Sequence, residues 1–153
     1  MKAIFKIIIL YFIFINTSNA DLIKPSSNFK PFEVLMIQLN SLKNNNEPYK
    51  DAGIEQTWEF AHPNNKLITG PLDKFKKLIY SESYKILLDL ESYEITIIKE
   101  TARMSIYKVF VLSKSKKKYY YVWKVEKVLI DGNLKNCWMT TSVSSPKYLG
   151  DVI

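Results

Sequence analysis

Two carboxylates stand close enough in the sequence to do acid–base chemistry together. Asp89 and Glu91 lie two residues apart in a stretch expected to be a strand, where side chains at that spacing share a face. On a shared face, one carboxyl can have a raised pKa and act as a general base. The alternative is that both are solvated and pair with Lys85 or Lys99 across the sheet. Asp89 is therefore a catalytic candidate with a competing structural interpretation.

His62 is the second catalytic candidate and the only histidine of the chain. A Ser-His-Asp triad would have to be built around it. It stands directly before Pro63 at an expected helix end, where an imidazole instead caps carbonyl groups or faces solvent. One histidine and one cysteine, Cys137, are too few ligands for an ordinary zinc site, and the four glycines are isolated. The sequence therefore predicts no metal and no cofactor.

Aromatic side chains could instead line a pocket and stack on a flat ligand. The candidates lie in both halves of the chain: Trp58, Tyr84, Tyr107, Trp123 and Trp138. For Trp58 and Trp138, which fall on apolar faces, burial in the core is the alternative.

A separate run combines lysines with tyrosines between Lys114 and Tyr121. Single-strand nucleic-acid binders mix these residue types, although the lysines also fit a solvated turn and the tyrosines a strand. Arg103 is the only arginine in the chain, whereas recognition of base edges favours the bidentate guanidinium. The composition therefore argues against sequence-specific binding of nucleic acid, and the net charge of +7 does not by itself require a partner.

The first twenty residues are typical of a secretory signal peptide. Lys2 and Lys6 lead into an apolar run over 7–15, and small residues precede a cleavage site after Ala20. The run is about half the ~20 residues that span a bilayer. We expect a secreted or luminal protein with no membrane span after cleavage, or alternatively one that reaches a complex plastid through the secretory route. Residues 21–30 are interpreted as a linker or a remnant of targeting.

Three helices are expected in the first part of the mature chain. Apolar residues recur at helical spacing from Phe32 to Leu42, after Pro31 at the first turn. A second helix begins after Asp51 and ends before Pro63. A turn through Asn64, Asn65 and Gly70 is expected next, and a third helix opens at Pro71.

Strands are expected from Tyr84 onward, because the chain becomes rich in Ile, Val, Tyr and Thr. Their ranges are 84–90, 93–100, 103–113, 118–130 and 134–143. In the fourth range one face is expected to be buried, with Tyr119, Tyr121, Trp123, Val125 and Leu129. A polar turn at 113–117 and a tight hairpin turn at 131–133 connect the longer ones.

The pattern predicts a single α+β domain over residues 31–143, followed by a tail at 144–153. Three N-terminal helices would pack on a curled antiparallel sheet to give a cone, as in cystatin-like or nuclear-transport-factor-like folds. A pocket is expected at the mouth of the cone.

Several stretches of the chain resemble one family. They are VLMIQLNSLKNN, GIEQTWEFAHPNNKLITGPLDKFKKLI, YKILLD and CWMTTSV, and together they span about residues 32–143. Their combination is similar to domain-of-unknown-function family 4864, which is itself similar to the nuclear-transport-factor-like cone. His62 stands where that family commonly has a small residue such as serine. The resemblance implies the fold and carries no established reaction.

Two functions therefore follow from the sequence. The first is a non-catalytic domain that binds a small apolar or aromatic ligand, a protein partner or a second copy of itself. The second is a small enzyme of the lyase or isomerase type, with Asp89 or His62 as its acid or base.

Overall fold

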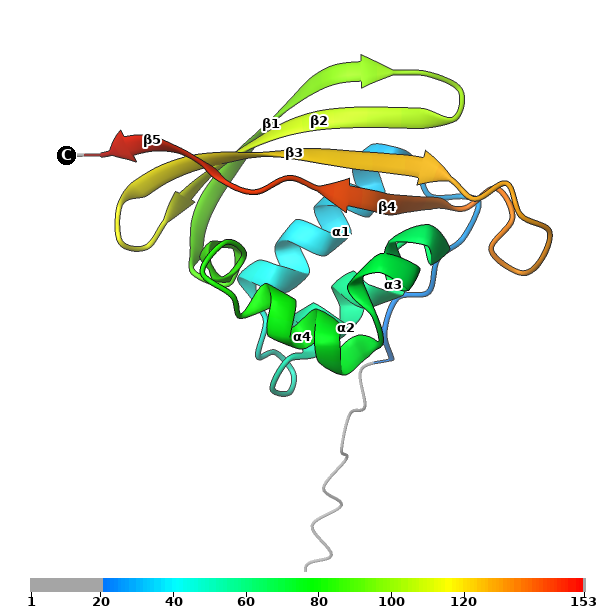
Figure 1. The fold of residues 1–153 in the computed structure, drawn as a ribbon, viewed down its shortest axis with the longest axis horizontal. Helices are drawn as coiled ribbons and strands as arrows, with labels where there is room; N and C mark the ends of the chain where they lie inside the picture. Colours follow the sequence, from blue (N-terminus) through cyan, green and yellow to red (C-terminus); the bar gives the residue numbers. More distant parts are fainter. Residues whose placement is uncertain (1–20, 153) are drawn as a thin grey trace, which may run out of the picture.

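The computed structural model describes residues 21–152 and has an α+β architecture, with helices on one side of an antiparallel sheet (Figure 1). The signal-peptide prediction for residues 1–20 lies outside the described residues. The helices come first in the chain: α1 (Pro31–Lys43), α2 (Ala52–Glu59), α3 (Pro63–Thr69), α4 (Leu72–Ile79) and the 3₁₀ turn η1 (Lys85–Leu87). The strands follow: β1 (Leu90–Glu100), β2 (Met104–Ser113), β3 (Lys117–Lys127), β4 (Trp138–Val143) and β5 (Lys147–Asp151).

The helix predicted after Pro31 is confirmed. Pro31 occupies the first helical position, where its missing N–H is not needed, and the Glu33 side chain accepts a 2.7 Å hydrogen bond from the Lys30 backbone N–H. The helical period then turns a run of apolar residues, including Leu35 and Leu39, into the core, where both are fully buried.

The second helix is also confirmed, and it crosses α1 at very close range through Gly53. The Gly53 N–H donates to the Asn45 carbonyl at 2.9 Å. A β-carbon at this position would lie 1.9 Å from the Ser41 carbonyl oxygen, so only glycine allows this approach. The buried Asn45 side chain also accepts from the Ile54 N–H at 2.9 Å, which joins the start of α2 to the end of α1.

The structure contains one helix that the sequence reading missed. The stretch from Pro63 to Gly70 was expected to be a turn, but it forms α3 before the expected helix α4 begins. His62 caps α3 and Pro63 takes its first helical position, so the proline that ends α2 also begins the next helix. Gly70 at φ 80° then separates α3 from α4.

The sheet is open within the described residues, with β1 at one edge and β4 together with β5 at the other. The order is β1-β2-β3-β4, and β5 pairs with the first half of β3 while β4 pairs with the second half. The expected tail therefore contains a strand. The stretch 84–90, expected to be a strand, instead forms η1 and a turn, and the tight turn expected at 131–133 lies within a longer loop over 128–137.

All four helices lie on the same side of the sheet (Figure 1), and the core fills the space between them. Along β3 the alternation is as expected: Tyr121, Trp123 and Val125 are fully buried. Leu129, expected on the same face, lies beyond the end of the strand and is 56% exposed.

Residues 21–29 are attached to the domain rather than free of it. The buried Gln56 side chain makes two hydrogen bonds with one residue of this segment: Ile23 N–H donates to its Oε1 at 2.7 Å, and its Nε2 donates to the Ile23 carbonyl at 2.8 Å. Phe29 packs edge-on against the buried Phe60 ring at 5.9 Å between centroids. The segment interpreted as a linker is therefore held on α2 and the core.

We expect Gln56→Ala to release this segment, because both hydrogen bonds are lost and each contributes about 0.5–1.5 kcal/mol. Hydrogen exchange should become faster at the Ile23 amide, and the free energy of unfolding should fall by about 1–3 kcal/mol. Lys24→Ala is the control, since it removes only the exposed ion pair to Glu59 at 3.0 Å. Equal effects of Gln56→Ala and Lys24→Ala would contradict the conclusion that Gln56 holds residues 21–29 on the domain.

Candidate functional site

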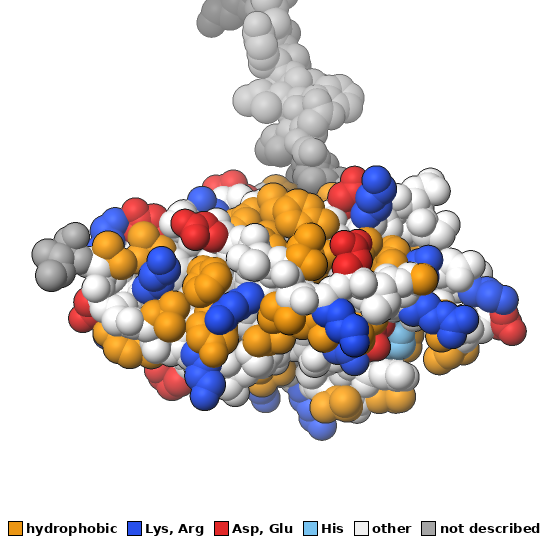
Figure 2. All heavy atoms as spheres, turned by 90° about the horizontal axis from the view of Figure 1, so that it is seen from above, with side chains coloured by type: hydrophobic (Ala, Val, Ile, Leu, Met, Phe, Trp, Pro, Cys, Tyr) orange, Lys and Arg blue, Asp and Glu red, His pale blue; other side chains and the backbone are white. Residues whose placement is uncertain are grey.

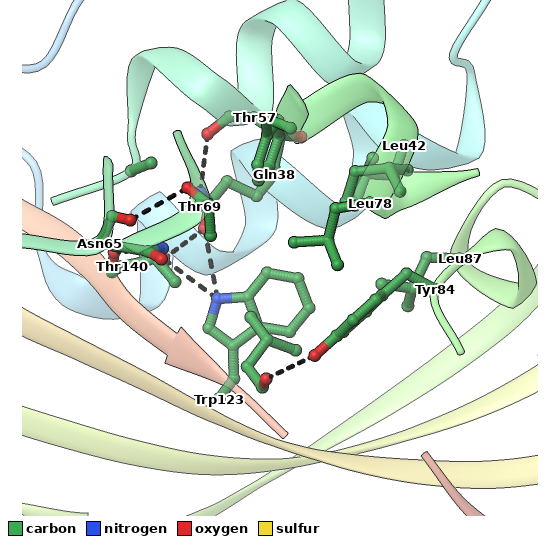
Figure 3. Close-up of a pocket in the computed structure, with 14 residues that line it drawn as sticks. Gln38, Leu42, Thr57, Asn65, Thr69, Leu78, Tyr84, Leu87, Trp123 and Thr140 are labelled. Carbon is green, nitrogen blue, oxygen red and sulfur yellow. Dashed lines mark hydrogen bonds between the residues drawn. The ribbon is translucent and has the colours of Figure 1, made fainter. Parts of the chain in front are cut away.

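A small cavity lies between the helices and the inner face of the sheet (Figure 3). Its volume is about 70 Å³, and α1, α2, α3, α4 and η1 line it together with β3 and β4. Figure 3 shows polar residues at one end, namely Gln38, Thr57, Asn65, Thr69 and Thr140, and the apolar residues Leu42, Leu78 and Leu87 at the other. Phe75, Ile79 and Val143 also line the cavity.

The polar end is organised around the amide of Gln38, which is buried on α1. Its Oε1 accepts hydrogen bonds from the Thr140 hydroxyl at 2.5 Å and from the Trp123 indole N–H at 3.3 Å, and its Nε2 donates to the Thr57 carbonyl at 3.0 Å. The Trp123 N–H also donates to the Thr140 hydroxyl oxygen at 3.0 Å. These contacts join α1, α2, β3 and β4 at one buried point (Figure 3).

Helix α3 is tied to the same point through the backbone of β4. The Thr140 carbonyl accepts from the His62 N–H at 2.8 Å and from the Asn65 side chain at 3.2 Å. Asn65 and Thr69 are four residues apart, so they share the face of α3 that is turned to the cavity.

Tyr84 borders the apolar end of the cavity. Its hydroxyl donates to the Val143 carbonyl at 3.0 Å, and its ring stacks on Tyr121 at 6.3 Å between centroids. Burial raises the pKa of Tyr84, and it raises the pKa of Tyr121 further. Both phenols therefore stay neutral at physiological pH.

The lining of this cavity contains no aspartate, glutamate, lysine, arginine or histidine. A general acid or base for proton transfer must lie within hydrogen-bonding reach of the substrate. The side chains that line the cavity present neutral hydrogen-bonding groups, the single phenol of Tyr84 and an aliphatic wall. This arrangement can hold an uncharged molecule in one orientation.

Two of the five predicted pocket residues, Tyr84 and Trp123, line the cavity. The other three lie elsewhere. Tyr107 is buried in the core beside Phe32, at 6.2 Å between ring centroids. Trp58 packs against Phe75 at 5.0 Å.

Trp138 lies at the start of β4, away from the cavity lining, with the Lys127 ammonium 5.2 Å from its ring centroid. The ring is half-buried and packs against the main core. Its role in this structure is packing, which was the stated alternative.

Asp89 and Glu91 do not form the expected pair. Asp89 precedes β1, is exposed, and borders a surface hollow of about 590 Å³ that is open to solvent. Glu91 lies within β1 and forms an ion pair with Lys116 at 2.6 Å, not with Lys85 or Lys99. The prediction of a shared strand face fails because the strand begins only at Leu90.

His62 is buried at the entry to α3 and is absent from the cavity lining. Its Nδ1 accepts a 3.1 Å hydrogen bond from the Asn64 backbone N–H, so the imidazole caps an N–H group at a helix start instead of carbonyls at a helix end. Burial lowers the pKa of His62, and the Glu126 carboxylate partly opposes that shift. The histidine has a structural role here.

The sequence reading missed the polar residues of the cavity. Gln38 carried a usable signal, because it lies on the apolar face of the 31–43 helix between Leu35 and Leu42. A buried amide at such a position needs partners. Asn65 and Thr69 carried no such signal, because the sequence predicts a turn, not a helix, in this stretch.

Comparisons with protein-family models, with curated proteins and with solved structures found no match to this chain. Within residues 21–152, no cluster of three or more histidine, cysteine, aspartate or glutamate side chains could hold a metal ion. None of the helices in this range has the length and apolar character needed to cross a membrane.

We expect Thr140→Val to weaken the cluster of buried hydrogen bonds around Gln38, which we call the polar junction, without changing the shape of the side chain. The substitution leaves the buried Gln38 oxygen and the Trp123 N–H each with one partner fewer, so unfolding free energy should fall by about 1–3 kcal/mol in urea titrations. The neighbouring Thr141→Val is the control, because the Thr141 hydroxyl is half-buried and lies 3.4 Å from the Lys124 carbonyl. A loss for Thr141→Val as large as that for Thr140→Val would contradict this assignment.

We expect His62 to make the protein less stable as the pH falls below neutral. In the unfolded chain a histidine titrates near pH 6.5, and burial lowers the folded pKa below that value. The stabilising contribution of neutral His62 to the free energy of unfolding is therefore complete above the unfolded pKa, and it is lost as the pH falls through the folded pKa. NMR titration of this single histidine should give a lowered pKa.

His62→Asn is the matched control for this pH dependence, because asparagine caps a helix start without titrating. Unfolding free energies measured at about pH 7.5 and 5.5 should converge more closely for the variant. If the free energy of unfolding of the variant differs between the two pH values as much as that of the unmodified protein, the pH dependence comes from other groups.

Proposed function

We propose that this protein is a non-catalytic binding protein whose cavity takes a small uncharged molecule with an apolar body and one polar end. The observation that carries the proposal is the division of the cavity lining: neutral hydrogen-bonding groups around Gln38 at one end and aliphatic and aromatic side chains at the other. Ligand sites commonly combine a mainly apolar wall with a few oriented polar groups. A charged ligand would lose its hydration here and find no counter-charge.

The volume of the cavity limits the size of the ligand that can bind in it. A cavity of about 70 Å³ is roughly half the ~150 Å³ that holds benzene in an engineered core. A short chain, or the end of a longer one, fits without rearrangement. Larger ligands require the cover of the cavity to move.

Helix α3 is the part of the cover that can move most easily. None of its residues is buried, and Leu67 and Ile68 on its outer face are each 83% exposed. It is bounded by Pro63 and by Gly70, and it contributes Asn65 and Thr69 to the cavity. Segments with few buried contacts open at low free-energy cost. Ligand entry would therefore occur at α3.

The lyase or isomerase alternative receives less support. It needs an acid or base at the bound molecule, but Asp89 borders an exposed hollow and His62 caps α3 outside the lining. For the described residues, the neutral lining favours binding over catalysis.

We also propose that the protein acts in the secretory pathway, or in a complex plastid reached through it, as the pattern of residues 1–20 indicates. The likeness to family 4864 and to the nuclear-transport-factor-like cone is a further proposal. Helices that precede an open antiparallel sheet and cover one of its faces are compatible with it. An experimental structure of the full chain with N-terminal sequencing of the secreted protein would test both.

We expect 1-hexanol, which is too large for the closed cavity of about 70 Å³, to bind there with an outward movement of α3, and hexanoate of the same length to bind far more weakly, because only the alcohol is neutral. The measurement is NMR titration of the Trp123 indole N–H and of the Thr140 amide. Shifts at both groups with hexanol alone would support the proposal. Equal shifts with hexanoate, or shifts confined to the surface, would contradict it.

Leu78→Phe should abolish these shifts, because the larger ring fills the apolar end of the cavity. Leu67→Phe is its matched control: it adds the same ring at a position of α3 that is 83% exposed. If both variants bind hexanol like the unmodified protein, the ligand occupies another site.

A further inference from the structure

The face of the sheet that is turned away from the helices carries no covering element within residues 21–152. Figure 2 shows this side of the molecule, where basic side chains lie among hydrophobic ones across the surface. The outward residues of the two central strands are half-buried: Ile106, Lys108, Phe110 and Leu112 on β2, and Lys118, Tyr120, Val122 and Lys124 on β3. We call this surface the open face.

An aromatic pair lies near the middle of the open face. Phe110 and Tyr120 are directly opposite each other on β2 and β3, with ring centroids 6.0 Å apart. The Lys108 ammonium lies 4.2 Å from the Tyr120 centroid and 5.3 Å from that of Phe110, and the Lys118 ammonium lies 5.9 Å from Phe110. Exposed cation–π contacts of this kind contribute only about 0.5–1 kcal/mol, so the lysines can leave the rings at low cost.

A hollow of about 180 Å³ lies beside this pair. The Phe110 ring and Lys118 border it, together with Glu94, Ser92, Leu112 and Val152. Its volume exceeds the ~150 Å³ that accommodates a benzene ring. One flat aromatic group can therefore lie in the hollow next to Phe110.

The open face is positively charged. Lys99 and Lys147 extend the array of Lys108 and Lys118, because they lie opposite outward residues of β2 and β3. Of the two acidic residues on the face, Glu126 is paired with Lys124 at 3.0 Å, and Glu94 stands at the hollow. Four lysines thus remain to attract anionic groups against one carboxylate.

We propose that the open face binds single-stranded nucleic acid with little sequence preference. Aromatic rings on a sheet surface stack on unpaired bases, and neighbouring cations neutralise the phosphates. The hollow takes one base beside Phe110, while Lys108 and Lys118 exchange their contacts with the rings for contacts with phosphate. Lysine, as a point charge without the bidentate geometry of arginine, suits contacts to the backbone and not to base edges.

Other occupants fit the face less well. A second copy of this chain would bring two positively charged faces together. A duplex would keep its bases paired and leave the rings nothing to stack on. This inference rests on a surface separate from the cavity, so it stands or falls independently of the proposed function.

Fluorescence anisotropy with a labelled oligothymidylate of about twelve nucleotides tests the inference. We expect saturable binding at about 50 mM salt, with log K falling against log[salt] at a slope of about −3, as four phosphate contacts predict. Absence of binding at this ionic strength would overturn the proposal. Binding that is tighter to duplex DNA of the same length would also overturn it.

The variants separate stacking from charge. Phe110→Leu and Tyr120→Leu should each weaken binding at least about fivefold with an unchanged salt slope, since stacking contributes about 1–3 kcal/mol per base. Lys108→Gln should weaken binding and reduce the slope by about 0.7. Lys77→Gln, which removes an equal charge from an exposed position of α4 on the helical side, should bind like the unmodified chain.

Two controls make a negative result informative. Each variant should keep its thermal unfolding midpoint and its Trp123 response to 1-hexanol, which excludes misfolding and separates this test from that of the cavity.

Heparin should compete poorly with the oligothymidylate for the open face. Equal competition by heparin, together with no effect of Phe110→Leu, would reassign the face to acidic polysaccharides. A dimer in sedimentation that the same variants dissociate would reassign it to a second copy.

Discussion

The buried amide of Gln38 is the interaction on which the inner side of this molecule depends. One side chain accepts from Thr140 and Trp123 and donates to the Thr57 carbonyl, so four elements meet at a single polar point. In a low-dielectric interior each of these groups would be costly to bury alone. The hydrogen bonds are directional, so they determine how α1 is rotated and where β4 lies along β3. Apolar packing alone would leave both less constrained.

The cavity lies directly beside this cluster of hydrogen bonds, and Gln38, Thr57, Trp123 and Thr140 line it. The close approach at Gly53 holds α2 against α1, because nothing larger than hydrogen fits against the Ser41 carbonyl. Helix α3 then covers the remaining side, with no buried residue of its own. Buried hydrogen-bonded groups therefore close the cavity on the α1 and sheet side, and a helix without buried residues closes it on the α3 side.

The two faces of the sheet have separate chemistry because strand side chains alternate. Inward positions of β2 and β3 supply Tyr107, Trp123 and other core residues. The positions between them present Lys108, Phe110 and Tyr120 outward. A substitution on one face therefore leaves the other largely intact. The same sheet can serve a neutral ligand inside and an anionic polymer outside without conflict between the two requirements.

The sequence by itself determined the α+β class, the helices that begin at Pro31 and directly after Pro71, and the inward face of β3, because these follow from local periodicity and from the fixed φ of proline. It also identified Tyr84 and Trp123 as pocket residues. Only the tertiary structure decided that Pro63 begins a helix, that η1 replaces a strand, and that β5 continues the edge of the sheet. It likewise decided that Gln38, Asn65 and Thr140 meet while Asp89 and Glu91 separate. Hydrogen bonds between residues up to 102 positions apart set those outcomes, and no local pattern encodes them.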